Sequence, residues 1–109
     1  MAKYVLVVPS SAKDGRDDEY NAWYNDVHIH DLLAIPGITS GRRFVPSPSS
    51  PMPPPANYLA LYEIECDDVG AVMAELNARA ASGKMQLSDA INLDTAKMWV
   101  FEQTVEVAG

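Results

Sequence analysis

The stretch EYNAWYNDVHIHDLLAIPG, Glu19–Gly37, decides the fold. Its apolar and aromatic residues recur at helical spacing, and a polar run precedes it. Pro36 disfavours helical backbone at the residue before it, and the glycine that follows supplies a turn. The sequence therefore predicts one helix that begins near Asp17 and ends between Asp31 and Ile35.

Strand patterns flank this helix on both sides. Runs rich in β-branched and aromatic residues occupy Lys3–Val8, Ile38–Val45, Asn57–Glu65 and Ala96–Val107. A second helix is expected over Asp68–Ser82, before Gly83, and Lys84–Thr95 is ambiguous, with a short helical turn around Ser88–Leu93 as one reading. The order β-α-β-β-α-β predicts an α+β, ferredoxin-like fold with one antiparallel four-stranded sheet and right-handed crossovers.

The length of 109 residues suits a single domain that spans 1–109. The only long break in its pattern is the proline-rich segment 46–56, PSPSSPMPPPA. Such a sequence favours extended polyproline backbone and forms neither a helix nor a central strand. We expect a loop here, which acts either as a plain spacer or as a lid over a cavity mouth.

Composition excludes several classes of partner. The formal net charge of −7 and the isoelectric point near 4.5 argue against binding to nucleic acid or to anionic membranes. The single cysteine, Cys66, cannot form an internal disulfide and suits a reducing compartment. Apolar runs are too short to span a membrane. The expectation is a cytoplasmic protein.

The predicted strands carry apolar residues on both faces. In Lys3–Val8 and in Asn57–Glu65, large apolar side chains occupy positions of both parities. Two helices can cover only one face of a four-stranded sheet. The second face must line a cavity or pack against another copy of the chain, so the pattern predicts a homodimer.

Two histidines lie in the first helix with different neighbours. His28 follows Tyr24 by four residues, so their side chains are adjacent and the imidazole could move a proton near neutral pH. A partly buried, hydrogen-bonded histidine that closes the helix end is the alternative. His30 follows Asp26 by four residues, which favours a surface ion pair. Histidines two residues apart on a helix do not converge, so no metal site is expected.

These residues also carry a family resemblance. The run Trp23-Tyr24-Asn25-Asp26-Val27-His28, followed by Ile35-Pro36-Gly37-Ile38 and by Arg42 or Arg43, resembles the W-Y-x-x-x-H…P-G…R stretch of EthD-type members of the dimeric α/β-barrel superfamily. The resemblance covers the first 45 residues and is topological beyond them. It departs at His30, where many relatives have proline.

The resemblance implies dimers whose sheets pack into a barrel, with a small hydrophobic cavity between sheet and helices in each subunit. His28 matches the histidine of the family, often a pocket acid or base, and Trp23 and Tyr24 match its aromatic positions. Such relatives include lactone isomerases, polyketide cyclases, cofactor-free monooxygenases, haem-degrading proteins and stress proteins without known chemistry. Fold alone therefore does not name a reaction.

Four further residues are candidates for substrate binding. Arg42 and Arg43 point to opposite faces of their strand, so at most one faces the cavity, where it could hold a carboxylate or enolate oxygen. The alternative is that both are solvated. Tyr62 lies in the segment that resembles the third strand. Trp99, with Phe101, suits the core or a dimer interface as well as a substrate wall.

We therefore expect a cofactor-independent enzyme that acts on a small, hydrophobic cyclic or aromatic carbonyl compound. The chemistry would be proton abstraction and return, as in isomerases, cyclases, dehydratases or lyases, with His28 as base or acid and Tyr24 and an arginine at the oxyanion. The sequence has no glycine-rich loop for a nucleotide cofactor. The alternatives are a non-catalytic small-molecule-binding or accessory protein and a cofactor-free monooxygenase.

Overall fold

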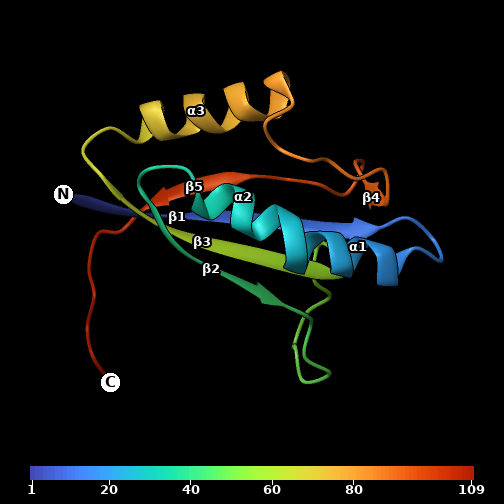
Figure 1. The fold of residues 1–109 in the computed structure, drawn as a ribbon. Coiled ribbons are helices and arrows are strands. Elements are labelled where there is room, and N and C mark those ends of the chain that lie inside the picture. The colour runs from blue at the N-terminus through green and yellow to red at the C-terminus, as the bar shows by residue number, and fades with distance from the viewer.

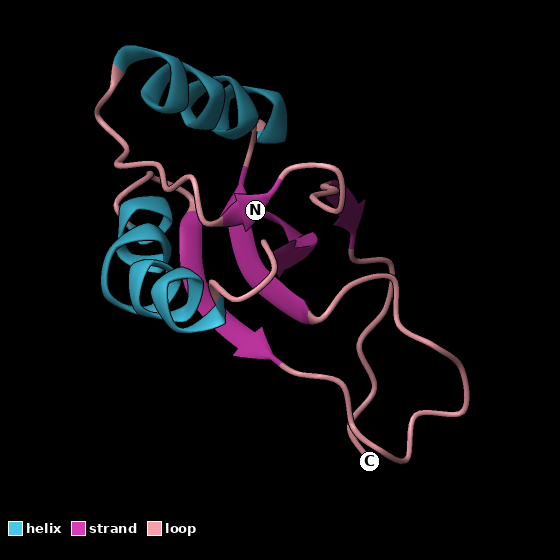
Figure 2. Cartoon of the chain, turned by 90° about the vertical axis from the view of Figure 1, so that its right-hand side faces the viewer, coloured by secondary structure: helices cyan, strands magenta, loops and turns pink.

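The computed structural model describes all residues from Met1 to Gly109. In chain order its elements are β1 (Ala2–Ala12), α1 (Asp17–Trp23), the π-helical turn η1 (Tyr24–His28), α2 (Ile29–Leu33), β2 (Ile38–Phe44), β3 (Tyr58–Cys66), α3 (Val69–Ser82), β4 (Ile91–Asn92) and β5 (Trp99–Glu102) (Figure 1). The main sheet is antiparallel in the order β2-β3-β1-β5. The helices lie on one side of it (Figure 2). The predicted ferredoxin-like α+β architecture is confirmed.

The first strand is longer than predicted, because Pro9 does not end it. Pro9 pairs with Leu59 of β3, and its carbonyl accepts a hydrogen bond from the Lys97 amide at 3.1 Å. The amide and carbonyl of one strand residue point to the same side. The donor that proline lacks would therefore face Lys97 and not β3, so the ladder between β1 and β3 continues through it.

The first helix falls within its predicted limits but is not a regular α-helix. Its middle is the π-helical turn η1, which the periodicity of the sequence did not reveal. A π turn holds one more residue than an α turn and often marks a functional site. Here it brings Trp23 and His28, five residues apart, into a stack with ring centroids 4.5 Å apart and an interplanar angle of 22°.

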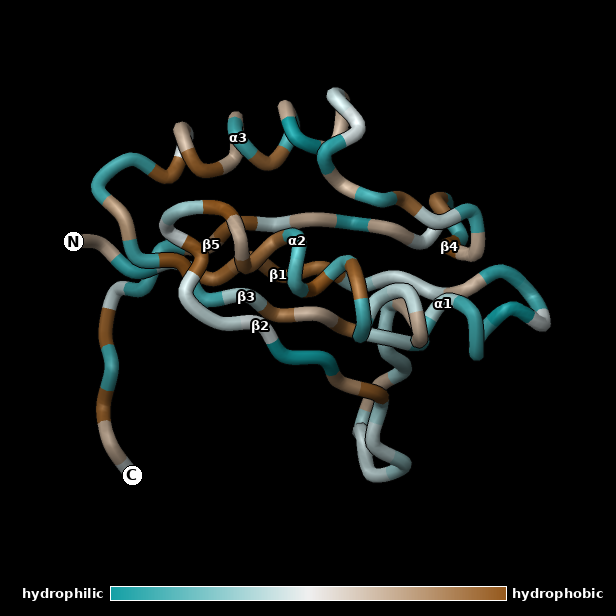
Figure 3. Tube along the Cα trace, viewed as in Figure 1, coloured by the Kyte–Doolittle hydropathy of each residue, from teal (hydrophilic) through white to brown (hydrophobic).

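The C-terminal third differs most from expectation. The predicted strand Ala96–Val107 is reduced to β5. The last bond between the two strands is the one that the Gln103 amide donates to the Lys3 carbonyl at 2.8 Å. Beyond it the chain has passed the start of β1 and has no strand to pair with. The rest forms an exposed tail of alternating hydropathy (Figure 3). The segment Ser88–Leu93 is not a helical turn either, because its central residues pair with the end of β1 as β4.

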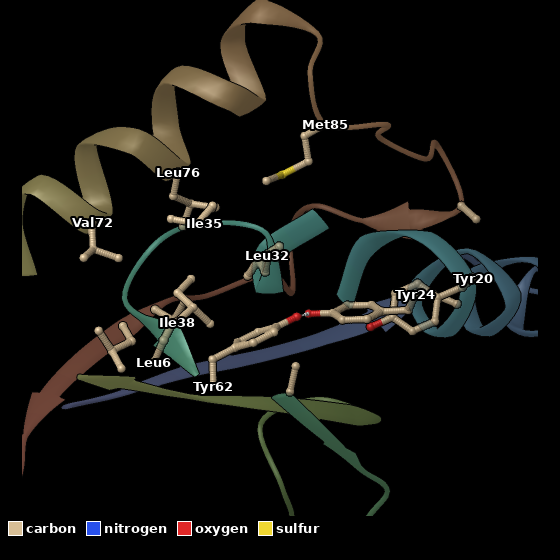
Figure 4. Close-up of a cluster of buried hydrophobic side chains, with 14 residues drawn as sticks. Leu6, Tyr20, Tyr24, Leu32, Ile35, Ile38, Tyr62, Val72, Leu76 and Met85 are labelled. Carbon is tan, nitrogen blue, oxygen red and sulfur yellow. Dashed lines mark hydrogen bonds between the residues drawn. The ribbon is translucent and has the colours of Figure 1, made fainter. Parts of the chain in front are cut away.

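The hydrophobic core lies between the sheet and the helices (Figure 4). Its fully buried large side chains include Leu6, Tyr20, Tyr24, Leu32, Ile35, Tyr62 and Ile64. The predicted second helix, now α3, adds Val72 and Leu76 from the side that faces the sheet (Figure 4). Gly41 of β2 is required for close packing, because a Cβ there would lie 3.0 Å from Ile29 and from the ring of Tyr62.

The opposite face of the sheet, here called the open face, is uncovered. The register places on it the residues that alternate with the core: Val5, Val7, Arg42, Phe44, Leu59, Leu61, Trp99 and Phe101. Phe44, Trp99 and Phe101 are 43%, 47% and 58% exposed. The proline-rich loop 46–56 projects away from the sheet beyond β2 (Figures 1 and 2).

Candidate active site

A cavity of about 610 Å³ lies between β1, the first helix and the chain that precedes β5. The first helix contributes Trp23, Tyr24 and His28, and β1 contributes Val8 and Ser10. The third wall is the segment 84–98, here called the strap. Its cavity-lining residues are Leu87, Ser88, Asp89, Ile91, Asn92, Leu93, Asp94, Ala96, Lys97 and Met98. Eight of the sixteen lining residues are hydrophobic and the other eight are polar or charged, a mixture that suits a small-molecule site.

His28 enters this cavity through the π turn. Its ring stacks on Trp23 and meets the Tyr24 ring edge to face, with centroids 4.9 Å apart and an interplanar angle of 89°. Its Nδ1 atom is buried and has no hydrogen-bond partner. Burial is the main cause that lowers the pKa of His28 to about 4; the Asp31 carboxylate opposes this shift, and the Arg43 cation adds a smaller lowering effect. The imidazole is thus neutral at pH 7 and can accept a proton.

Tyr24 is held beside His28 as a neutral phenol. Tyr62 Oη donates a hydrogen bond to Tyr24 Oη at 3.3 Å (Figure 4). Burial is the main cause that raises the pKa of Tyr24 far above its ordinary value and the pKa of Tyr62 to about 12. Because Tyr62 supplies the proton of their mutual bond, the Tyr24 hydroxyl keeps its own proton to donate.

The strap is fixed to the first helix at Gln86 and to the N-terminal end of that helix at Asp89. Trp23 Nε1 donates to the Gln86 carbonyl at 2.8 Å, and the Gln86 amide donates to Asp31 Oδ2 at 3.3 Å. Arg16 also pairs with Asp89 Oδ1 at 2.7 Å. These contacts fix the position of the strap relative to His28. Trp23 therefore both stacks on the histidine and anchors the wall that faces it.

The structure brings together only some of the residues singled out in the sequence. Trp23, Tyr24 and His28 line the cavity, and Tyr62 lies directly behind Tyr24. Arg43 is on the helix side of β2, opposite the buried Ala60, but it lies behind the tyrosines and does not line the cavity.

Two of the expected substrate-binding residues lie elsewhere. Arg42 is on the open face, with its guanidinium 3.8 Å from the Glu63 carboxylate, and both side chains are more than half exposed. Trp99 is on the same face of β5, where the sequence analysis also allowed a dimer interface. Neither residue lines the cavity.

His30 differs from His28 in its surroundings. It is exposed and does not line the cavity. No carboxylate lies within 4.0 Å of it, so the predicted ion pair with Asp26 is absent. The π turn explains this, because it rotates α2 relative to Asp26 and removes the regular spacing on which the pair depended.

Sequence reasoning missed the whole third wall of the cavity. Lys13 and Lys97 add two cations to the lining, and the strap supplies most of its apolar surface. A signal was present, because large apolar residues such as Leu87 and Leu93 stand in a segment that fits neither helix nor strand. Residues of this kind in an irregular segment are typical of a wall that closes over a site.

No group of three or more His, Cys, Asp or Glu side chains is placed to hold a metal ion. None of the helices has the length and apolar character needed to cross a membrane.

Comparisons by sequence found no matching family model and no matching curated protein. Comparison by structure did find neighbours. The haem-degrader MhuD from Mycobacterium tuberculosis, with two haems in its active site, aligns with a TM-score of 0.66 and 17% identity over 96% of this chain and 99% of that one. A second MhuD structure, with two manganese protoporphyrin IX molecules per active site, gives 0.66 and 18% over 97% and 99%.

An EthD-family protein from Bacillus halodurans aligns with a TM-score of 0.55 and 12% identity over 95% of this chain and 100% of that one. At such low identity the likeness is one of fold. It agrees with the W-Y-x-x-x-H stretch and with the strand order described above. The chain thus shares the ferredoxin-like fold of these proteins.

Proposed function

We propose that the cavity is the active site of a cofactor-independent enzyme that acts on a small, hydrophobic cyclic or aromatic carbonyl compound. The observation that carries the proposal is His28. It is a neutral imidazole with an unpartnered ring nitrogen, at a cavity of about 610 Å³, next to a phenol that is free to donate.

In the proposed reaction His28 removes a proton from the carbon next to the carbonyl group. The electron pair of the broken C–H bond moves into the carbonyl and leaves negative charge on its oxygen. The Tyr24 hydroxyl donates a hydrogen bond to that oxygen. The imidazolium then returns the proton to another carbon, or to a leaving group, so the cycle needs no oxidant and leaves His28 neutral.

The weak basicity of His28 narrows the choice of substrate. An imidazole whose pKa is about 4 removes protons effectively only from carbon acids that are already activated. Compounds with a C–H between two carbonyl groups, or conjugated to one, fit this requirement. The apolar walls that Trp23, Ile91 and Leu93 provide suit a flat ring of this kind.

Hydrogen exchange in D₂O tests the proton step without knowledge of the final product. A panel of cyclic 1,3-dicarbonyl and conjugated enone compounds is incubated with the protein, and loss of each C–H signal is followed by proton NMR. The proposal predicts exchange above the solvent rate with the wild type and not with His28→Gln. His30→Gln is the matched control, because His30 is exposed and away from the cavity.

The same assay separates an enzyme from a binding or accessory protein. If panel compounds bind, as shown by shifts of the protein's own NMR signals, but neither exchange nor conversion exceeds the solvent rate, the cavity is a binding site without turnover. Oxygen consumption on an electron-rich phenol would instead indicate a cofactor-free monooxygenase.

A tetrapyrrole is a second candidate ligand, as a substrate. MhuD holds two haems in its active site on the same fold, and a histidine, His28, lines this cavity. Haem titration followed by absorbance near the Soret band tests it. A saturable shift that is lost in His28→Ala would favour a tetrapyrrole substrate. The absence of any shift would exclude it and leave the carbonyl compound as the candidate substrate.

We also propose that the protein is a homodimer built through the open face. The support is its exposed aromatic surface, which includes Phe44, Trp99 and Phe101.

A further inference from the structure

Arg43 is enclosed by aromatic rings behind the active-site tyrosine. Its guanidinium carbon lies 4.4 Å from the ring centroid of Tyr24 and 5.3 Å from those of Tyr20 and Tyr58. Because Arg43 does not line the cavity, it cannot contact a substrate there. Any effect of Arg43 on the chemistry in that cavity must therefore act through the side chains between them.

The surroundings hold this cation in place without neutralising it. Arg43 Nη1 donates to Asn21 Oδ1 at 3.0 Å and to Asn25 Oδ1 at 2.8 Å. Its Nε and Nη2 atoms are buried without hydrogen-bond partners, and no carboxylate lies within 4.0 Å. Buried arginines usually pair with a carboxylate. Here neutral amides and aromatic ring faces surround the guanidinium instead, so no direct ion pair neutralises its charge.

We propose that Arg43 is a positioning residue for the proposed reaction: its charge, held on the ring face of Tyr24 without a carboxylate partner, makes the phenol a stronger donor and adds to the burial that disfavours a charged His28. The proposal rests on the proposed function for the roles of Tyr24 and His28. A cation against an aromatic ring draws electron density from it, which strengthens its O–H as a donor. The same charge disfavours a second cation on the neighbouring imidazole.

The effect of the Arg43 charge on His28 can be measured separately from the effects of the other charged groups nearby. Asp31 of α2 faces His28 and opposes the effect of Arg43. The remaining charged groups at the cavity are Lys13, Asp89, Asp94 and Lys97, and the remaining titratable group is Tyr24. A substitution at Arg43 leaves all of these in place.

The test is the pH titration of His28, followed by NMR of the imidazole Cε1–H signal, in four variants. Arg43→Met removes the charge, and Arg43→Lys keeps it in another shape. Asn25→Asp leaves the arginine in place but puts a carboxylate beside its Nη1, at an exposed position. Arg42→Met is the control, because Arg42 is the adjacent arginine on the open face.

The proposal predicts that Arg43→Met and Asn25→Asp raise the pKa of His28 above its wild-type value, while Arg43→Lys and Arg42→Met leave it near that value. If Arg43→Met does not fold, Arg43→Lys and Asn25→Asp are still measured, although a new carboxylate at position 25 also acts on His28 directly, so only an unchanged titration in Asn25→Asp is decisive. An unchanged titration in Asn25→Asp, or a rise in Arg43→Lys equal to that in Arg43→Met, would overturn the proposal in favour of a purely structural arginine.

Turnover gives a second reading on any substrate found in the exchange assay. Arg43→Met should lower kcat roughly tenfold with little change in KM, since the effect appears as charge develops on the substrate oxygen. A rise in KM alone would contradict the proposed route through Tyr24. The titration does not need a substrate, so failure to find any activity would sink the proposed function while leaving the electrostatic role of Arg43 testable.

Discussion

The two faces of the sheet are built from the same strands but differ in burial. On the helix side, Leu6, Tyr62 and Ile64 are completely buried, whereas on the open face Trp99 and Phe101 are 47% and 58% exposed. The chain by itself therefore completes a core and a cavity on one face and leaves apolar surface on the other. The difference underlies the two roles that we propose: chemistry on the covered face and association through the open face.

The largest expected effect tests the covered face. His28→Gln should lower turnover by roughly 10²–10⁴-fold, the scale of a positioned acid or base, because glutamine cannot take up the proton. The dimer should persist. His30→Gln should leave turnover within about twofold and change stability by at most about 1 kcal/mol, as for an exposed side chain without a partner. Steady-state kinetics on a substrate from the exchange panel measures both, and an essential His30 would contradict the site.

Phe101→Glu tests the open face. A carboxylate buried without a partner in an apolar interface costs several kcal/mol. The dissociation constant of the dimer should therefore rise by about 100-fold or more. Light scattering over a range of concentrations measures it. Val105→Glu is the control, because this residue is also exposed but lies on the tail beyond β5. A wild-type protein that is monomeric at micromolar concentration would refute the predicted association.

The pH dependence of stability tests the burial of His28. Its pKa falls from the ordinary 6.5 to about 4 on folding, so the unfolded chain binds more protons between these values. Stability should therefore fall as the pH drops from about 6.5 to about 4, by up to about 3 kcal/mol more in the wild type than in His28→Gln. Urea unfolding of both proteins at pH 7 and pH 4.5 isolates the difference. Parallel losses in the two proteins would show that the histidine is not buried.

The smallest effect concerns the hydroxyl pair behind the cavity. Tyr62→Phe removes the donor to Tyr24 Oη while keeping the ring, so stability should fall by about 1 kcal/mol, the net value of one hydrogen bond. Denaturant unfolding measures this change. A loss of more than about 3 kcal/mol would mean that the pair supports more of the core than a single bond.

Local patterns predicted the covered face better than the site that it carries. The strand order, both helices and the turn at Gly37 follow from hydrophobic period, proline and glycine, which act within a few residues. The alternation of β2 also shows that Arg42 and Arg43 face opposite ways. It does not say which one is inward, because that depends on the pairing of Arg43 with Ala60 in β3.

The π turn and the strap could not be predicted, because tertiary contacts stabilise them. The π turn is accompanied by the stack of Trp23 on His28 and by the bond from Trp23 to the Gln86 carbonyl, 63 positions away along the chain. β4 likewise exists only through its pairing with Ser11 and Ala12. The early end of β5 depends on where β1 begins. Each of these features joins distant parts of the chain, which periodicity within a window does not detect.

The pH profile of deuterium exchange tests the central claim most directly, since it links the buried histidine to the proton step. Exchange into a panel substrate is measured by NMR from pH 3 to pH 8 in the wild type and in His28→Gln. The account predicts a wild-type rate that is constant above about pH 5 and falls below pH 4, where the imidazole becomes protonated, and no catalysed exchange in the variant. Catalysed exchange that persists in His28→Gln with the same acidic limb would contradict it.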